Sequence, residues 1–295
     1  SACLVGSEMC IRDSRNCDLS FSNLCSWRFL YNTQFAVVDN FLVFKFWAGD
    51  QLAYMMPVGT GDLKAILWEL IEDARKENQP FCMLGVCSNM RADLEAILPE
   101  QFTFTEDRDY ADYIYLRSDL STLKGKKFQA KRNHTNRFKN TYPDYEYTPI
   151  TPDRIQECLD LEAEWCKVNN CDQQEGTGNE RRALIYALHN FEALGLTGGI
   201  LHVNGKIVAF TFGMPINHET FGVHVEKADT SIEGAYAMIN YEFANRIPEQ
   251  YIYINREEDL GLEGLRKAKL SYQPVTILEK YMACLKEHPM NMVKW

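Results

Sequence analysis

The distribution of hydrophobic and polar positions predicts the same order of strands and helices in two parts of the chain. The first part opens with apolar runs at 35–38 and 41–47, which are rich in Phe and Val and are typical of strands. After a run at 53–56, apolar residues recur every three or four positions and predict a helix capped by Asp62: Leu63, Ile66, Leu67, Leu70 and Ile71. The elements expected after it are a strand at 81–86, a helix at 90–98 and a strand at 113–116.

The second part begins at Thr197 and repeats this order. Its first two strands, 198–203 and 206–214, are joined by Asn204-Gly205, a dipeptide typical of a two-residue hairpin turn. A third strand at 221–225 precedes a helix that Thr230 or Ser231 can cap. The elements expected to complete this part are a helix at 232–246, a strand at 251–255, a short helix at 264–270 and a strand at 275–278.

The repeated order predicts an α+β protein with two similar domains in tandem. We place the first domain at 15–123 and the second at 151–295, with a basic connecting segment at 124–150 and a helix near 152–167. Each domain is expected to hold a mixed sheet between helices, and a ligand cleft is expected where the two domains meet.

The first fourteen residues are expected to be foreign to the fold. Residues 4–14 read LVGSEMCIRDS, which resembles the in-frame translation of a transposase-type sequencing adapter. The alternative is a natural N-terminal tail, but a likeness over eleven consecutive codons is more specific than a short motif. Residues 1–14 are therefore left out of the predicted domains.

The amino-acid composition indicates a globular protein. The chain has 295 residues, of which 46% are hydrophobic and 24% charged, values typical of a globular protein. Its net charge of −10 argues against a protein that coats duplex DNA. No apolar run is long enough for a membrane-spanning helix, and we identify no secretory signal. The cysteines form no CxxC pair, so we expect no metal site, reduced thiols and a cytoplasmic location.

The stretch 124–139 is the first candidate for ligand binding. It holds seven Lys or Arg residues and no acidic residue, on a chain that is otherwise acidic. Phe128 and Phe138 can anchor it as a helix, and its remaining surface suits phosphates or carboxylates. The alternative is a solvated helix face. The residues assigned to donor binding here are Lys131, Arg132, His134 and Arg137.

The junction at 226–238 is the second candidate. A strand end, a short loop with Gly234 and Ala235, and a helix start follow one another, so that unpaired N–H groups can bind an anion; an ordinary helix start is the alternative. Alternation along the preceding strand places His224 and Glu226 on one face. Such a pair can act as a general base or be purely structural.

The segment 253–274 is the most distinctive. Polar residues at the expected strand end form a candidate cleft wall with the helix residue Arg266: Asn255, Arg256, Glu257 and Asp259. Lys267 and Lys269 follow on the helix as candidate donor ligands, opposite Lys131. Tyr272 can protonate a leaving group. Simple surface salt bridges and a packed tyrosine are the alternatives.

These segments resemble the DUF2156 family, which is similar to the C-terminal domain of phosphatidylglycerol lysyltransferases. The residues that carry the likeness are 255–274 (NREEDLGLEGLRKAKLSYQP), 126–147, 161–165 (LEAEW) and 21–31 (FSNLCSWRFLY). The resemblance implies two tandem GNAT-like domains, as in the Fem-type aminoacyl transferases. The membrane-embedded half of those lysyltransferases has no counterpart here, which argues against a lipid acceptor.

The resemblance also implies transfer of an acyl or aminoacyl group to an amine or hydroxyl acceptor. The donor expected is aminoacyl-tRNA or an acyl-CoA; a clear Q/R-x-x-G-x-G/A loop for CoA is missing, since 231–236 offers only Gly234-Ala235. In the expected mechanism His224 or Glu226 deprotonates the acceptor, Tyr272 protonates the leaving group, and no metal or resident cofactor is required. A CoA-dependent N-acyltransferase of a small metabolite and a non-catalytic module for an RNA end or anionic metabolite remain alternatives.

Overall fold

The computed structural model describes residues 14–169 and 175–286, which form two compact units. The first unit comprises 31–111 and the chain from Glu279, and the second comprises 15–30 and 112–278. Of the predicted foreign stretch at 1–14, only Ser14 lies among the described residues, and it is buried.

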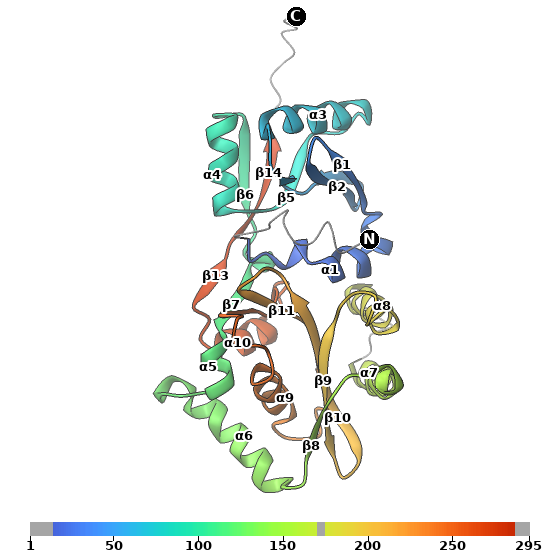
Figure 1. The fold of residues 1–295 in the computed structure, drawn as a ribbon, viewed down its shortest axis with the longest axis vertical. Helices are drawn as coiled ribbons and strands as arrows, with labels where there is room; N and C mark the ends of the chain where they lie inside the picture. The colour runs from blue at the N-terminus through green and yellow to red at the C-terminus, as the bar shows by residue number, and fades with distance from the viewer. Residues whose placement is uncertain (1–13, 170–174, 287–295) are drawn as a thin grey trace, which may run out of the picture. The chain divides into compact units, whose positions relative to one another are not determined.

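The first unit is a mixed sheet packed with helices (Figure 1). Its strands are β1 (Gln34–Val38), β2 (Phe41–Ala48), β3 (Gln51–Tyr54), β4 (Val58–Gly59), β5 (Cys82–Cys87), β6 (Phe102–Glu106) and β14 (Lys280–Leu285). They follow the order β1-β2-β3-β5-β14-β6, with β4 beside β2. The helices are α3 (Leu63–Lys76) and α4 (Ser88–Ile97). The predicted cap of α3 is confirmed, because the Asp62 carboxylate accepts from the Ala65 N–H at 3.1 Å.

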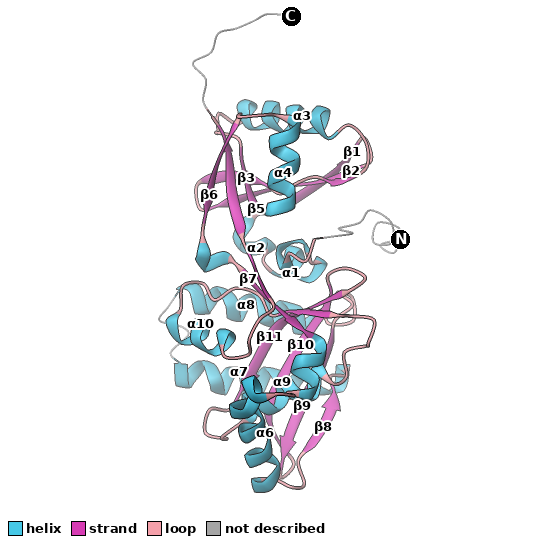
Figure 2. Cartoon of the chain, turned by 90° about the vertical axis from the view of Figure 1, so that its left-hand side faces the viewer, coloured by secondary structure: helices cyan, strands magenta, loops and turns pink. Residues whose placement is uncertain are grey.

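The second unit is also a mixed sheet, with helices on both faces (Figures 1 and 2). Its strands are β7 (Asp112–Leu116), β8 (Glu146–Pro149), β9 (Thr197–Val203), β10 (Lys206–Pro215), β11 (Thr220–Ala228), β12 (Tyr253–Asn255) and β13 (Thr276–Leu278), in the order β13-β7-β12-β11-β10-β9-β8. The helices are α1 (Phe21–Ser26), α2 (Arg28–Tyr31), which ends at the unit boundary, α5 (Arg117–Thr122), α6 (Gln129–Thr141), α7 (Ile155–Asn169), α8 (Glu175–His189), α9 (Ala235–Ala244) and α10 (Glu263–Leu270). Short 3₁₀ turns occur in this unit at Cys17–Leu19, Lys126–Phe128 and Pro152–Arg154, and in the first unit at Arg108–Tyr110.

Three hydrophobic clusters hold helices to the second sheet, and one of them joins α6 and α9 to β9 and β10. The aromatic residues of β7 pack with α9 and Tyr272 on one face. Leu161 of α7 and Leu188 of α8 pack with Phe212 of β10 on the other. The predicted α+β class, with a mixed sheet between helices in each unit, is therefore confirmed, as is the Asn204-Gly205 turn, where both residues have positive φ.

The predicted domain boundaries at 123/124 and 150/151 differ from the observed units. The strand β7, expected in the first domain, pairs with β12 and β13 of the second unit. The strand β14, expected in the second domain, lies between β5 and β6 of the first. Strand pairing depends on contacts distant in sequence, which a contiguous division of the chain cannot represent.

The expectation of reduced thiols is wrong for Cys82. It is bonded to Cys284, which lies directly opposite on the neighbouring strand β14 with a Cα–Cα distance of 4.1 Å. The two residues are 202 positions apart in sequence, so only the register of β5 with β14 brings them together. Cys166 of α7 is also disulfide-bonded. The cysteines that keep their thiols include Cys17, Cys25, Cys87 and Cys158.

We predict that the Cys82–Cys284 bond stabilises the first unit by about 2–5 kcal/mol, because it restricts the unfolded chain. Dithiothreitol should lower the melting temperature of the wild-type protein by more than it lowers that of the C82S/C284S variant. Equal effects of the reductant on both proteins would contradict the assignment.

The start of α9 differs from the expected cap at Thr230 or Ser231. Gly234 is the N-cap residue, with φ of +85°. A Cβ atom there would lie 3.1 Å from the His134 carbonyl oxygen of α6, so the two helices approach closely only because residue 234 is glycine. Ala235, the first residue of α9, is also buried.

Gly234→Ala should therefore destabilise the protein more than a Gly→Ala substitution at a position where the positive φ is the only cost. Gly205 provides the control, since its φ is +73° and nothing lies within 4 Å of the position that a Cβ atom would take there. We expect Gly205→Ala to cost about 1 kcal/mol and Gly234→Ala about 2–3 kcal/mol in chemical denaturation. Equal losses would show that the α6 contact is not tight.

Candidate active site

The candidate site lies where two parallel strands of the second unit stop pairing. Thr220–Gly222 of β11 pairs with Tyr253–Asn255 of β12, after which β12 ends while β11 continues to Ala228. The residues beyond the paired segment define what we call the β11–β12 split: His224 and Glu226 on β11, and Arg256 and Glu257 after β12. Every residue predicted for the site belongs to this second unit, and the cleft expected where two domains meet stays a prediction.

A bulge in β11 changes the predicted alternation of side chains. Phe212 of β10 pairs with Val225 and Gly213 pairs with Val223, so that His224 is an extra residue in the strand. Val223 consequently packs in the cluster with α9, whereas Val225 packs against the cluster of α7 and α8. Regular alternation along β11 would instead have placed these two valines on one face of the sheet.

His224 and Glu226 accordingly have different partners. The His224 Nδ1 atom is 2.7 Å from the Glu257 carboxylate, and its Nε2 atom is buried without a hydrogen-bond partner among the described residues. Glu226 accepts two hydrogen bonds from the Arg256 guanidinium, at 3.0 and 3.2 Å, and one from the Asn240 amide at 3.3 Å. The split therefore contains a histidine–carboxylate pair and a separate arginine–carboxylate pair.

The Arg256–Glu226 pair is enclosed by aromatic rings. The two side chains are only 12% and 14% exposed, and the guanidinium lies 4.8 Å from the Tyr272 ring centroid and 5.7 Å from that of Tyr115. The Arg256 Nη1 atom is buried, and no described residue accepts a hydrogen bond from it. A buried donor of this kind is costly unless a ligand or water satisfies it, so Nη1 can bind an anionic or carbonyl oxygen.

Lys131 adds a second cation. Its Nζ atom is 3.9 Å from the centroid of the Tyr272 ring. Burial, with the positive charge of Arg256 as a smaller contribution, lowers the pKa of Lys131 to about 8. Lys131 and Arg256 are thus two cations beside the carboxylates of Glu226 and Glu257, and the formal charges of these four groups cancel.

The Tyr272 ring lies against these cations. Its side chain is buried, and burial raises the pKa of its hydroxyl, so the group stays protonated at neutral pH but is a weaker acid than an exposed tyrosine. The adjacent Arg256 partly opposes this shift in pKa.

The other residues assigned to donor binding have different contacts. Arg132 donates to the backbone carbonyls of Leu123 and Gly125, and Arg137 pairs with Glu233 at the surface. The His134 and Lys267 side chains are exposed, and no contact among the described residues joins them to the split. The buried Lys269 ammonium donates to the Arg256 carbonyl at 2.6 Å and to that of Glu258. Arg132 and Lys269 therefore hold backbone in place.

The remaining residues of the predicted cleft wall support the loop after β12. Asn255 is buried and donates to the Asp112 carboxylate at 2.7 Å, while its amide oxygen accepts from the Glu257 N–H at 2.7 Å. Asp259 accepts from Arg266 at 2.7 and 2.8 Å. Burial opposes ionisation of Asp259, but hydrogen bonds from Arg266 and Tyr113 hold its pKa well below the usual range.

Two residues that contact the split were missed by the sequence analysis. Asn240 is a polar position on the largely apolar helix α9, a pattern that does signal a buried polar contact. Asn23 donates to Glu257 at 2.9 Å from the segment 15–30, which lies far away in sequence. Its position in FSNLCSWRFLY, one of the segments that carry the family likeness, was the signal that could have found it.

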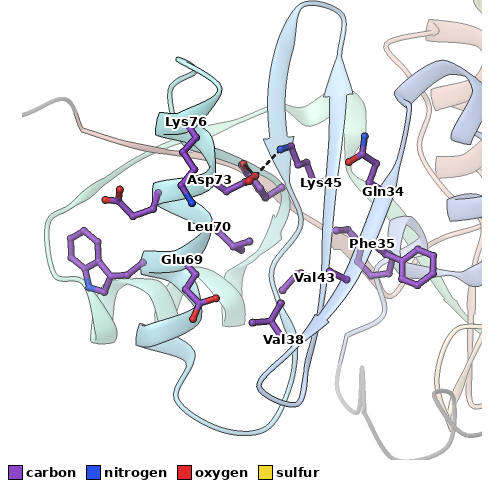
Figure 3. A pocket seen from close by; sticks show the side chains of 14 residues that line it. Gln34, Phe35, Val38, Val43, Lys45, Glu69, Leu70, Asp73 and Lys76 are labelled. Atoms are coloured by element: carbon purple, nitrogen blue, oxygen red, sulfur yellow. Dashed lines mark hydrogen bonds and ion pairs between the residues drawn. The ribbon is translucent and has the colours of Figure 1, made fainter.

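A groove in the first unit is distinct from the split (Figure 3). It has a volume of about 680 Å³ and lies between the β1–β2 hairpin and α3, with apolar side chains such as Phe35 and Leu70 and a Lys45–Asp73 ion pair of 2.8 Å. None of the predicted site residues lines this groove.

Comparison with known proteins places the chain in a family. Residues 11–284 match the family described as phosphatidylglycerol lysyltransferase, C-terminal, and the chain belongs to it. The predicted recognition is thus confirmed, and the family description is that of a transferase domain.

Three similar proteins show how far the likeness extends. A conserved protein of unknown function from Bacteroides thetaiotaomicron VPI-5482 has a crystal structure with 91% identity and a TM-score of 0.92, with 94% of each chain covered. The structure of L-PGS from Bacillus licheniformis has the same fold, with 18% identity, a TM-score of 0.63, and coverage of 90% of this chain and 88% of that one. An uncharacterised protein of Mycoplasmoides gallisepticum is 25% identical over 177 residues, or 58% of this chain. The match spans only 55% of that curated relative.

Among the described helices, none combines the length and the apolar character that crossing a membrane requires.

We predict that Lys131 titrates near pH 8 in the folded protein. Because its pKa is lower in the folded chain than in the unfolded one, the unfolded chain binds more protons between about pH 8 and 10.5, and raising the pH through this window stabilises the fold. Carbon-13 NMR of reductively methylated protein should show one lysine signal titrating near pH 8. It should vanish in Lys131→Met and persist in Lys267→Met; its persistence in the first variant would refute the assignment.

Proposed function

We propose that this protein is an acyl- or aminoacyl-transferase that moves the acyl group of a phosphate-bearing donor to an amine or hydroxyl by direct attack. Family membership supports the reaction class. The observation that carries the proposal is the buried His224, which Glu257 binds through Nδ1 and whose Nε2 atom has no partner among the described residues.

His224 rather than Glu226 is the general base of this mechanism. The Glu226 carboxylate already accepts hydrogen bonds from Arg256 and Asn240, so its oxygens are less available to contact an acceptor. The Glu257 carboxylate can only accept a hydrogen bond, so it favours a hydrogen on Nδ1 of His224 and leaves the Nε2 lone pair free. Nε2 can then take a proton from the acceptor.

The proposed transfer uses only the two substrates, solvent and side chains of this site. The acceptor nitrogen or oxygen forms a bond to the donor carbonyl carbon while His224 Nε2 takes its proton. Arg256 and Lys131 stabilise the oxyanion. The bond between this carbon and the leaving oxygen or sulfur then breaks, Tyr272 supplies a proton to the leaving group, and the proton on His224 restores Tyr272 through solvent.

Aminoacyl-tRNA is the favoured donor. A CoA pyrophosphate would need exposed N–H groups at the start of α9, the place where the sequence analysis expected Gly234 and Ala235 to bind an anion. There the backbone of His134 packs against Gly234, and Ala235 is buried. This packing disfavours the CoA-dependent alternative.

Activity is tested by incubating the protein separately with labelled aminoacyl-tRNA and acetyl-CoA, each with a pool of amines and lipids. We expect product from aminoacyl-tRNA. Product from acetyl-CoA alone would establish the CoA-dependent alternative, and tight donor binding without turnover would establish a non-catalytic module.

His224→Asn should lower kcat by about 10²–10⁴-fold and leave donor affinity nearly unchanged, because it removes the base but not the anion-binding cations. His189→Gln is the control, since His189 is an exposed histidine on α8. Single-turnover kinetics and donor titration provide the two measurements. Normal turnover by a folded His224→Asn protein would exclude this base.

A further inference from the structure

Asn23 contacts the same carboxylate oxygen that binds His224. Its Nδ2 atom is 2.9 Å from Glu257 Oε1, and that oxygen is 2.7 Å from His224 Nδ1. The same amide nitrogen donates to the Cys17 carbonyl at 3.1 Å. Because both partners of Asn23 can only accept, a flipped amide would place its oxygen against two acceptors. The orientation of the amide is thereby defined.

Glu257 has little freedom to move away from these contacts. Its φ of +57° is unusual for a residue with a side chain, and such backbone persists where its surroundings enforce it. The Glu257 N–H donates to the Asn255 amide oxygen at 2.7 Å, and its carbonyl accepts from Tyr113 at 3.2 Å. Backbone contacts therefore fix the residue, while Asn23 fixes the carboxylate.

The supporting segment comes from outside the continuous sequence of the second unit. Residues 15–30 precede the first unit in the chain but belong to the second by their contacts. Ser20 caps α1 by accepting from the Asn23 N–H at 3.3 Å, so the backbone that carries the amide is itself held.

We propose that Asn23 is a positioning residue that anchors the Glu257 carboxylate and so keeps His224 in the tautomer with hydrogen on Nδ1 and a free lone pair on Nε2. Its effect on turnover rests on the proposed function, whereas its effect on the tautomer does not. A carboxamide suits this role, because it donates to Glu257 without adding a charge beside the carboxylate.

The test measures the tautomer directly. Long-range proton–nitrogen NMR of histidine-labelled protein, with His224 assigned by its loss in His224→Asn, should show hydrogen on Nδ1 in the wild type. Asn23→Leu removes the donor at similar volume and should give a mixture of both tautomers. It should also lower kcat about 10–100-fold with KM unchanged, because the base is misplaced but the donor cations remain.

Asn190→Leu is the matched control, since the Asn190 amide donates to the Tyr186 carbonyl at 2.8 Å on α8. It should leave the His224 tautomer unchanged. If Asn23→Leu does not fold, Asn23→Ser provides a polar side chain too short to reach Glu257.

The outcomes separate the two proposals. Hydrogen on Nε2 in the wild type, or an unchanged tautomer in a folded Asn23 variant, would overturn the role of Asn23. A tautomer that shifts as expected in a protein without turnover on either donor would overturn the proposed function and leave the role of Asn23 standing.

Discussion

The short parallel pairing of β11 with β12 is the constraint on which the site depends. Three residue pairs join the strands before β12 ends, and the bulge at His224 changes the direction of the side chains that follow on β11. Beyond the last of these pairs, β11 and β12 no longer pair with each other, and side chains lie where the sheet would otherwise continue. Four polar residues consequently line the split in the middle of a sheet whose two faces are otherwise packed with apolar side chains.

Burial gives these polar groups their chemistry. A guanidinium and a carboxylate enclosed by tyrosine rings lose most of their hydration, and they are retained because each partner compensates the other. The same low-polarity surroundings lower the pKa of Lys131 and raise that of Tyr272. The buried atoms of Arg256 and His224 that no described residue satisfies are then the places where a substrate can replace lost water.

Most elements were predictable because their signals are local. Apolar spacing identified α3, the Asn204-Gly205 dipeptide identified the β9–β10 turn, and Asp62 was correctly assigned as a cap. The strands β6 and β14 were missed, because their buried and exposed positions do not alternate regularly. Among the site residues, the cluster at the end of β12 was predictable because several charged residues follow one another there, which is more than an ordinary solvent-exposed loop requires.

The sequence alone does not determine which charged side chains contact one another in the folded protein. The order of strands and helices, the acidic balance and the family likeness follow from spacing and composition within short windows. The exchange of β7 and β14 between the two units, the Cys82–Cys284 bond and the contact of Asn23 with Glu257 join positions up to 234 residues apart. The direction of the side chains after His224 depends on a one-residue bulge. Only the packed structure decided these features, because strand register and helix docking are properties of the whole fold rather than of a local segment.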